Sequence, residues 1–300
     1  MYISSLSIVN YKNFKSVTFS FVKDSVNTII GENAAGKTNV FQAMRLVLDE
    51  SLPSNAKQLQ NEDFHRALGQ PFGHWIVIAI EFDDLSNSEE EQVLANYVMN
   101  KDRRLELTGK GTYTFVFRPK FHIRHSLFEL TKDLKSKEER EEAFYEFVSG
   151  QVINRDTYEA IAFVRTNLDF TQEDTYKKHV GDFVEFTFPD PNEENKAEIG
   201  NDKPPYFSIV SEVACTYVKA LRNVVSDLKY YKTNPLYKLL TLTSKEIEDD
   251  TDVVSDIVNV NEKISAIPEI DALSRSISSS LLNTVGSTYS DLHQKFWTLS

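Results

Sequence analysis

The stretch Val26-Asn27-Thr28-Ile29-Ile30-Gly31-Glu32-Asn33-Ala34-Ala35-Gly36-Lys37-Thr38-Asn39 decides how this sequence is interpreted. A short β-forming run precedes a loop with the pattern GxxxxGK[ST], and a helical pattern follows it, which is the context that a phosphate-binding loop (P-loop) requires. The glycines let the backbone approach a phosphate closely. Successive N–H groups and the positive end of the following helix then face that phosphate. The sequence therefore predicts a nucleoside triphosphate site at residues 31–38.

The residue types in this loop assign the expected roles. In P-loops the lysine reaches the β- and γ-phosphates, and the hydroxyl after it ligates Mg²⁺. We therefore expect Lys37 to bind phosphate and Thr38 to bind the magnesium ion that accompanies ATP. The residues expected to line the nucleotide are Gly31, Asn33, Ala34, Ala35, Gly36, Lys37, Thr38 and Asn39, and Lys12 and Asn13 are either further contacts to ribose or phosphate or a plain β-turn.

A second acidic motif is harder to find. Hydrolysis by a P-loop enzyme requires a carboxylate near the end of another buried strand. Residues 76–80 form an apolar run that leads to Glu81 and Asp83, but this run begins a series of alternating strands. We interpret both carboxylates as ordinary polar residues at a strand end. No catalytic residue is assigned, and whether the chain is an enzyme stays open.

Composition excludes several other classes of protein. The 300 residues carry 45 acidic and 33 basic side chains, a net charge of −12, which argues against a generally cationic nucleic-acid coat. A single cysteine, Cys215, excludes an internal disulfide framework. The six histidines lack metal-site spacing, and no apolar run reaches the ~20 residues of a membrane span. No secretory signal is visible, so we expect a cytoplasmic protein without a membrane partner.

Hydrophobic periodicity divides the chain into a β-rich and a helical part. Strands are expected at residues 3–9, 17–21, 26–30, 75–82, 112–123, 160–166 and 182–188. Helices are expected after the P-loop, within residues 132–149, over about 208–231, and at 264–267 and 270–285. A polar loop rich in proline occupies residues 189–205. We predict an ATPase core over residues 1–240, with a β-rich region over about 75–188, and a helical segment over 241–300.

One cationic stripe stands out in this acidic sequence. Arg118, Lys120, His122 and Arg124 occupy alternate positions of the strand expected at residues 112–123, so they would project from one face. Such a row requires negative charge opposite, either carboxylates of a neighbouring strand or the phosphates of DNA. Arg118, Lys120 and Arg124 are therefore candidate DNA contacts. Pro119 points to an edge strand or a bulge at this place.

Several segments resemble a known family. Residues 8–14, Ile-Val-Asn-Tyr-Lys-Asn-Phe, resemble the opening of RecF-, SMC- and OLD-type ATPases, and the loop with Asn33 and Asn39 is similar to theirs. Glu62-Asp63-Phe64-His65 is similar to an element of OLD-family (overcoming lysogenization defect) proteins. Residues 218–222, 234–240 and 282–299 resemble later OLD segments; within them Arg222 matches, and Asn223 stands where an acidic residue is frequent.

The resemblance implies an α/β fold, an ABC/RecF/SMC-type P-loop ATPase head with a β-rich subdomain and a C-terminal helical segment. It also implies a homodimer formed through the helical segment, and in the whole protein a Toprim nuclease that this sequence does not contain. We therefore expect this chain to be part of an OLD-like endonuclease that is regulated by ATP, binds DNA and acts in anti-phage defence with a partner protein, as Gabija-type and retron-associated effectors do. A RecF- or SMC-like DNA-repair ATPase and a nucleotide-binding module without hydrolysis are the alternatives.

Overall fold

The computed structural model describes residues 1–217, apart from residues 34, 50–51, 53, 87, 89–90, 102–106, 195, 204–207, 214 and 216. The chain divides into two compact units, Met1–Asn223 and Val224–Ser300. The described residues belong to the first unit. The helices predicted at residues 264–267 and 270–285, and the family segments after residue 217, lie outside the described residues.

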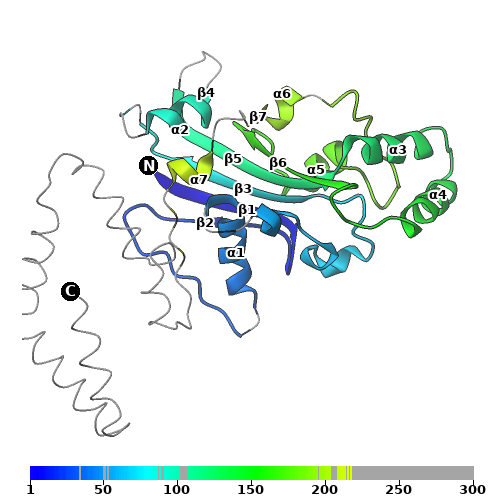
Figure 1. Cartoon of the computed structure of the whole chain (residues 1–300), viewed down its shortest axis with the longest axis horizontal. Helices are drawn as coiled ribbons and strands as arrows, with labels where there is room; N and C mark the ends of the chain where they lie inside the picture. Colours follow the sequence, from blue (N-terminus) through cyan, green and yellow to red (C-terminus); the bar gives the residue numbers. More distant parts are fainter. Residues whose placement is uncertain are drawn as a thin grey trace, which may run out of the picture. The chain divides into compact units, whose positions relative to one another are not determined.

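Within the described residues, seven strands form one antiparallel sheet, which crosses the middle of Figure 1. The strand order is β2-β1-β3-β5-β6-β7, and β4 pairs with β5. The strands are β1 (Tyr2–Tyr11), β2 (Phe14–Ser20), β3 (Ile76–Asp83), β4 (Met99–Lys101), β5 (Leu107–Pro119), β6 (Tyr158–Val164) and β7 (Asn201–Asp202). The strands predicted at residues 3–9, 17–21, 75–82 and 160–166 are confirmed.

The two faces of the sheet bury different side chains. Because successive strand residues point to opposite faces, Ile8 and Ile78 contribute to one hydrophobic cluster, whereas Val9 and Val77 contribute to another. The first cluster includes the buried side of α1 (Lys37–Leu48), which lies below the sheet in Figure 1. The sheet therefore carries the helix that begins at the P-loop on one of its faces.

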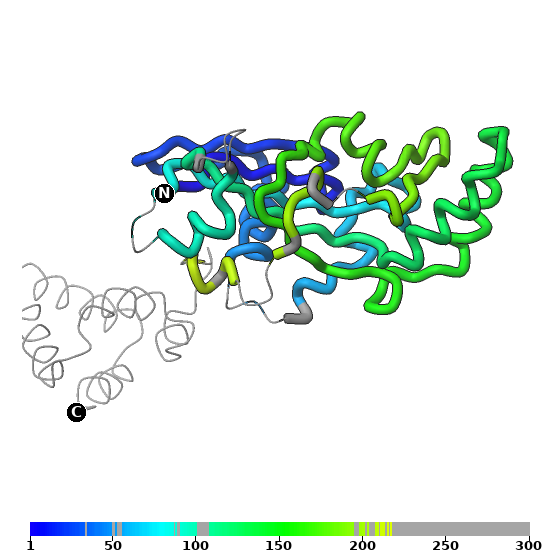
Figure 2. The backbone as a smooth tube through the Cα atoms, turned by 90° about the horizontal axis from the view of Figure 1, so that it is seen from above, coloured from blue at the N-terminus to red at the C-terminus, as the bar shows by residue number. Residues whose placement is uncertain are grey.

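The structure describes six further helices, of four to thirteen residues. They are α2 (Gln92–Tyr97), α3 (Phe121–Thr131), α4 (Lys137–Ser149), α5 (Glu173–His179), α6 (Lys196–Ile199) and α7 (Ile209–Glu212), with 3₁₀ turns at Ser54–Lys57, Asn61–Asp63 and Arg66–Leu68. Helices α3 and α4 project from the end of the sheet remote from the N-terminus (Figure 2). Helix α4 confirms the helix predicted within residues 132–149. It begins after Ser136, which forms a capping box with Glu139.

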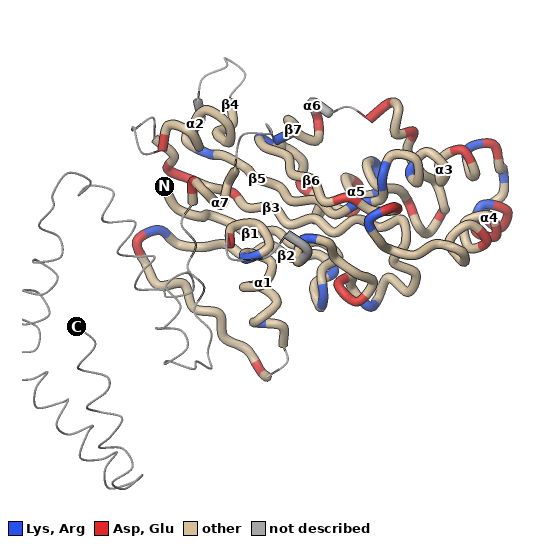
Figure 3. Tube along the Cα trace, viewed as in Figure 1, with Lys and Arg blue, Asp and Glu red and all other residues tan. Residues whose placement is uncertain are grey.

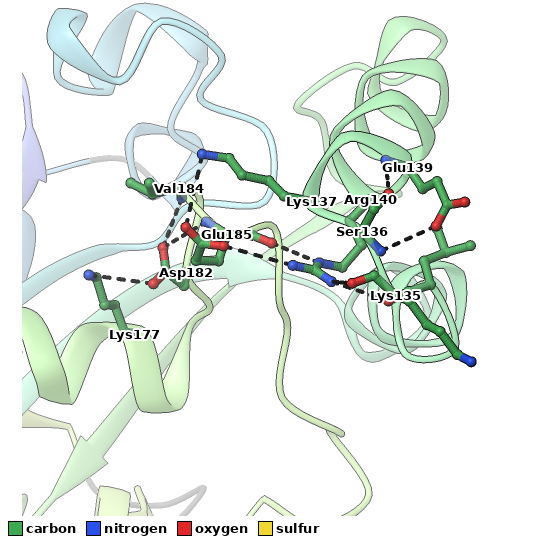
Figure 4. A network of polar contacts seen from close by, with 10 residues as sticks. Lys135, Ser136, Lys137, Glu139, Arg140, Lys177, Asp182, Val184 and Glu185 are labelled. Carbon is green, nitrogen blue, oxygen red and sulfur yellow. Dashed lines mark hydrogen bonds and ion pairs between the residues drawn. The ribbon is translucent and has the colours of Figure 1, made fainter.

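The strand predicted at residues 182–188 is wrong. Its residues form a turn in which Asp182 Oδ1 accepts hydrogen bonds from the N–H groups of Val184 and Glu185, at 2.8 and 3.2 Å. Arg140 of α4 donates to the Glu185 carbonyl oxygen, and Lys177 of α5 pairs with Asp182 (Figure 4). The short aspartate side chain satisfies the backbone locally, so a turn replaces a strand ladder.

Three other predictions need correction. Residues 26–30 form no strand; Val26 and Ile30 are each 90% exposed, and no described strand pairs with them. The strand predicted at residues 112–123 ends at Pro119, after which the chain turns into α3. The helix predicted at about 208–231 is described only at its start, where α7 stops at Glu212 because Val213 is extended.

Residues 189–205 are not a uniform loop, because α6 and β7 form within them. Among the helices that the structure describes, none has the length and hydropathy needed to cross a bilayer.

Candidate nucleotide site

The P-loop leads directly into the N-terminus of α1. Gly36 is the N-cap of α1, with φ +91°, and no side chain caps the helix. Only glycine takes this left-handed conformation without strain. Within the described residues, the N–H groups of Gly36 and Lys37 donate no hydrogen bond, so they are available to an anion.

The lysine of the loop lies against the loop itself. Lys37 Nζ donates hydrogen bonds of 2.6 Å to the carbonyl oxygens of Gly31 and Glu32. The amine is thereby held at the start of the loop, close to the backbone that would surround a phosphate. A phosphate oxygen is a stronger partner for an ammonium group than a neutral carbonyl, because both members of the hydrogen bond are then charged.

The other predicted loop residues are arranged around this helix start. Thr38 is exposed in the first turn of α1, as a hydroxyl that ligates magnesium must be. Asn33 and Ala35 are exposed, and Ala35 N–H donates to the Glu32 carbonyl oxygen at 3.2 Å. Ala34 lies outside the described residues. The N–H groups of Gly36 and Lys37, the left-handed glycine and the lysine side chain together fit a triphosphate and its magnesium ion.

The turn between β1 and β2 contacts the loop through Asn13. Asn13 Nδ2 donates to the Ala35 carbonyl oxygen at 3.0 Å, and Asn13 Oδ1 accepts from Asn39 Nδ2 at 2.8 Å. The structure thus brings Asn13 and Asn39 together with the loop. In this arrangement Asn13 contacts the protein backbone that would hold the nucleotide.

Lys12 is held by a different segment. Its ammonium group pairs with the Asp63 carboxylate, and its N–H donates to the Asp63 carbonyl oxygen at 2.7 Å. His65 N–H donates to the Asn10 carbonyl oxygen at 3.0 Å. The pKa of His65 lies below its usual value because of burial and the nearby charge of Lys15. The element at residues 62–65 therefore lies beside the turn that contacts the P-loop.

Glu81 and Asp83 lie at the opposite end of β1 from this turn. Ser4 at the start of β1 donates to Glu81 Oε1 at 3.0 Å, whereas the turn follows Tyr11. A strand rises by about 3.4 Å per residue, so roughly 24 Å separates the two ends. Lys110 Nζ lies 3.8 Å from Glu81 and 3.3 Å from Asp83. Both carboxylates therefore lie at the end of the sheet remote from the β1–β2 turn, paired with Lys110.

The predicted cationic stripe does not form. Because the strand ends at Pro119, Lys120 becomes the N-cap of α3, and Arg124 belongs to that helix. Arg118 and Arg124 both donate to Glu194 Oε1, at 2.8 and 2.9 Å. Basic and acidic residues alternate around this end of β5 in Figure 3. The candidate DNA contacts therefore do not share a strand face.

The two arginines are packed as well as paired. Arg118 is 7% exposed, and its Nε lies 3.0 Å from Glu159. Both guanidinium groups lie over the Trp75 ring, at 5.1 and 5.7 Å. Burial and the nearby charge of Arg118 lower the pKa of Arg124. Glu194 was not predicted to balance these cations, because it lies 70 or more residues away in a polar loop.

Tyr176 is a second residue that the sequence does not reveal. Its hydroxyl accepts hydrogen bonds from Asn10 Nδ2 at 2.8 Å and Trp75 N–H at 3.1 Å, and it lies 3.0 Å from His74 Nδ1. An aromatic residue in a short polar helix gives no signal of such a role. Cys215 is half-buried against the core, and Arg222 lies outside the described residues.

Comparison with known proteins agrees with this geometry. Residues 1–296 match the family described as "AAA ATPase domain". A DNA replication and repair protein RecF from Bacillus cytotoxicus is 31% identical over 109 residues, which are 33% of this chain and 29% of that protein. RecF from Bacillus thuringiensis is 39% identical over 74 residues, 23% of this chain and 20% of that protein. The chain thus spans less than a third of these relatives' length.

Proposed function

The chain belongs to the AAA ATPase domain family, and from this we propose that it binds ATP with Mg²⁺ at residues 31–38 and couples the nucleotide to work on DNA. Its architecture and its likeness to RecF are those of a P-loop ATPase of the RecF, SMC and ABC type. The observation that carries the proposal is the uncapped start of α1 at Gly36, with the Lys37 amine beside it.

The residues of the loop divide the binding between them. The N–H groups of Gly36 and Lys37 receive a phosphate, because a helix start without caps offers donors and partial positive charge. Lys37 exchanges the carbonyl oxygens of Gly31 and Glu32 for phosphate oxygens. The Thr38 hydroxyl holds Mg²⁺, which when bound neutralises phosphate charge.

A role in DNA maintenance is supported by the similarity to RecF, a DNA replication and repair protein. The similarity to RecF covers less than half of this chain and less than a third of each relative. The activity of the whole protein is therefore part of the proposal. DNA binding through Arg118 and Arg124 is not part of it, because Glu194 and Glu159 pair with these cations.

An OLD-type endonuclease in anti-phage defence is the second candidate function. Its support is the element at residues 62–65, whose Asp63 pairs with Lys12 in the β1–β2 turn that contacts the P-loop. Both candidates use the same nucleotide site, and both include a homodimer.

The test uses the whole protein with ATP, Mg²⁺ and DNA. A repair ATPase should bind DNA in an ATP-dependent manner and hydrolyse ATP faster when DNA is present. The Lys37→Ala variant should lose both effects, whereas Lys132→Ala, which removes an exposed lysine on α3's C-terminal side, should retain them. Magnesium-dependent cleavage of DNA would select the endonuclease. Equal ATP binding by wild type and Lys37→Ala would overturn the site.

A further inference from the structure

Asn13 joins the β1–β2 turn to the P-loop at the peptide between Ala35 and Gly36. Its Nδ2 donates to the Ala35 carbonyl oxygen at 3.0 Å, and its Oδ1 accepts from Asn39 on α1 at 2.8 Å. A single exposed side chain therefore contacts both the loop and the first turn of the helix that follows.

The hydrogen bond to Ala35 fixes the direction of a functional N–H group. The Ala35 carbonyl and the Gly36 N–H belong to one planar peptide unit, and in a trans peptide they point in opposite directions. Since Asn13 holds the carbonyl on its own side, the Gly36 N–H must point away from Asn13. That N–H donates to no acceptor among the described residues, so it stays directed at the space where an anion binds.

The space around Gly36 supports the same conclusion. A Cβ atom at residue 36 would overlap with the amide of Asn13. The Asn13 side chain thus packs against the bare backbone of Gly36, while Gly36 takes φ +91°. The close approach and the left-handed conformation therefore both favour glycine at residue 36.

The turn itself is anchored in the core. Asn10, with φ +57°, is 4% exposed, and its Nδ2 donates to the Trp75 carbonyl oxygen at 3.0 Å and to the Tyr176 hydroxyl at 2.8 Å. Lys12, with φ +52°, is held by Asp63. Two non-glycine residues in the left-handed region persist only where the surroundings hold them. These buried contacts are what give Asn13 a fixed starting point.

We propose that Asn13 is a positioning residue for phosphate binding, and that Asn10 and Tyr176 are its buried anchor. Asn13 aims the Gly36 N–H at the phosphate by holding the Ala35 carbonyl, and Tyr176 keeps the turn in place through Asn10. The proposal rests on the proposed ATP site and adds to it an element outside the loop that sets its affinity.

The first experiment measures ATP–Mg²⁺ dissociation constants by calorimetry for the full chain. Loss of two hydrogen bonds in Asn13→Ala should weaken binding about tenfold. Binding of ADP and of tripolyphosphate should weaken by a similar factor, because the substitution changes the contacts to the phosphates. The melting temperature without nucleotide should stay close to that of Ser7→Ala, a control that removes the exposed Ser7–Thr18 hydrogen bond elsewhere in the same hairpin. A change in melting temperature with unchanged affinity would mean a structural role only.

A double-mutant cycle checks that the residues act as one unit. Asn39→Ala removes the second partner of Asn13, so the double variant should bind ATP about as well as Asn13→Ala alone. Additive losses would contradict a shared action. Asn13→Asp should resemble Asn13→Ala, because a carboxylate cannot donate to the Ala35 carbonyl oxygen.

The anchor is tested with Tyr176→Phe, which should weaken ATP binding about threefold. The control Tyr145→Phe changes an exposed tyrosine and should leave ATP binding unchanged. Unchanged affinity in Tyr176→Phe would remove the anchor from the proposal. If wild type binds ATP and Asn13→Ala binds it equally well, the positioning role is wrong and the ATP site stands. If wild type binds none, the ATP site itself is wrong.

Discussion

Lys37 Nζ donates a 2.6 Å hydrogen bond to the carbonyl oxygen of Gly31, so this contact joins the two ends of the P-loop. The amine must leave this carbonyl to meet a phosphate. Binding therefore exchanges a contact within the loop for a charge-assisted one, and the exchange favours phosphate.

ATP–Mg²⁺ should raise the melting temperature of the chain through Lys37. At ~100 times the dissociation constant the gain is about 2.7 kcal/mol, which corresponds to a shift of about 5 °C for a chain of this size. Lys37→Ala should abolish the shift, and Thr38→Ala should make it less dependent on Mg²⁺. Differential scanning fluorimetry measures both effects. A full shift in Lys37→Ala would contradict the assignment.

Gly36→Ala should weaken both the fold and nucleotide binding. The new Cβ overlaps with the Asn13 amide and meets a φ of +91°, and such strain costs about 1–3 kcal/mol. Gly150→Ala is the matched control, because φ is −98° there and nothing lies within 4 Å of the added atom. Chemical denaturation compares the two variants. Equal stability would show that residue 36 tolerates a side chain.

Glu194→Ala should destabilise the protein by about 3–5 kcal/mol, since it leaves the buried guanidinium groups of Arg118 and Arg124 without a shared carboxylate. Glu193→Ala, at an exposed neighbouring residue, should change the free energy of unfolding by less than about 0.5 kcal/mol. Urea unfolding at neutral pH distinguishes them. If Glu194→Ala were neutral, the arginines would not depend on this pairing.

Acid should destabilise the fold in part through His74. Burial lowers the pKa of His74 to about 3, so the imidazole stays neutral in the folded chain while it takes up a proton in the unfolded chain below about 6.5. Stability is therefore retained above pH 6.5 and is lost as the pH falls from 6.5 towards 3, by up to about 1.4 kcal/mol per pH unit. The free energy of unfolding should therefore depend less steeply on pH in His74→Gln than in His122→Gln, which replaces an exposed histidine. Denaturant unfolding at several pH values across this range measures both slopes. Equal slopes would contradict the burial effect.

Any ATP turnover should be insensitive to Glu81→Gln. Glu81 lies at the far end of β1 from the turn that contacts the P-loop, with Ser4 and Lys110 as partners. Phosphate release assays on Glu81→Gln, with Lys37→Ala as the inactive reference, test this. A loss of turnover in Glu81→Gln would make Glu81 the missing catalytic carboxylate.

Local patterns in the sequence predict what local forces decide. The P-loop pattern and the spacing of Val40, Ala43 and Val47 correctly predict α1, because one helix face must be buried. The apolar run at residues 76–80 correctly predicts β3, because both faces of that strand are buried. Pattern alone could not predict that Asp182 turns the chain by capping its own backbone, or that Pro119 ends β5 so that the stripe divides between two elements.

Local sequence patterns could not predict the contacts between segments that are far apart in the chain. The pairing of Arg118 with Glu194 and of Asn10 with Tyr176 depends on how strands and loops meet in space. The exposed Val26 and Ile30 show the converse case, in which a β-forming run has no partner strand among the described residues. Residue types therefore predicted the loop, and the tertiary fold supplied the residues that hold it.

The pairing of β1 with β3 has a consequence for the folding kinetics. Val9 pairs with Val77, and the P-loop and α1 lie in the chain between them. Closing a segment of about 70 residues has an entropic cost that a local hairpin such as β1–β2 avoids. Contacts between residues that are far apart in the sequence slow folding. The β1–β2 hairpin should therefore form early, and β3 should join it late. Because the Trp75 carbonyl that anchors Asn10 comes with β3, the nascent chain should acquire nucleotide affinity only at that late step.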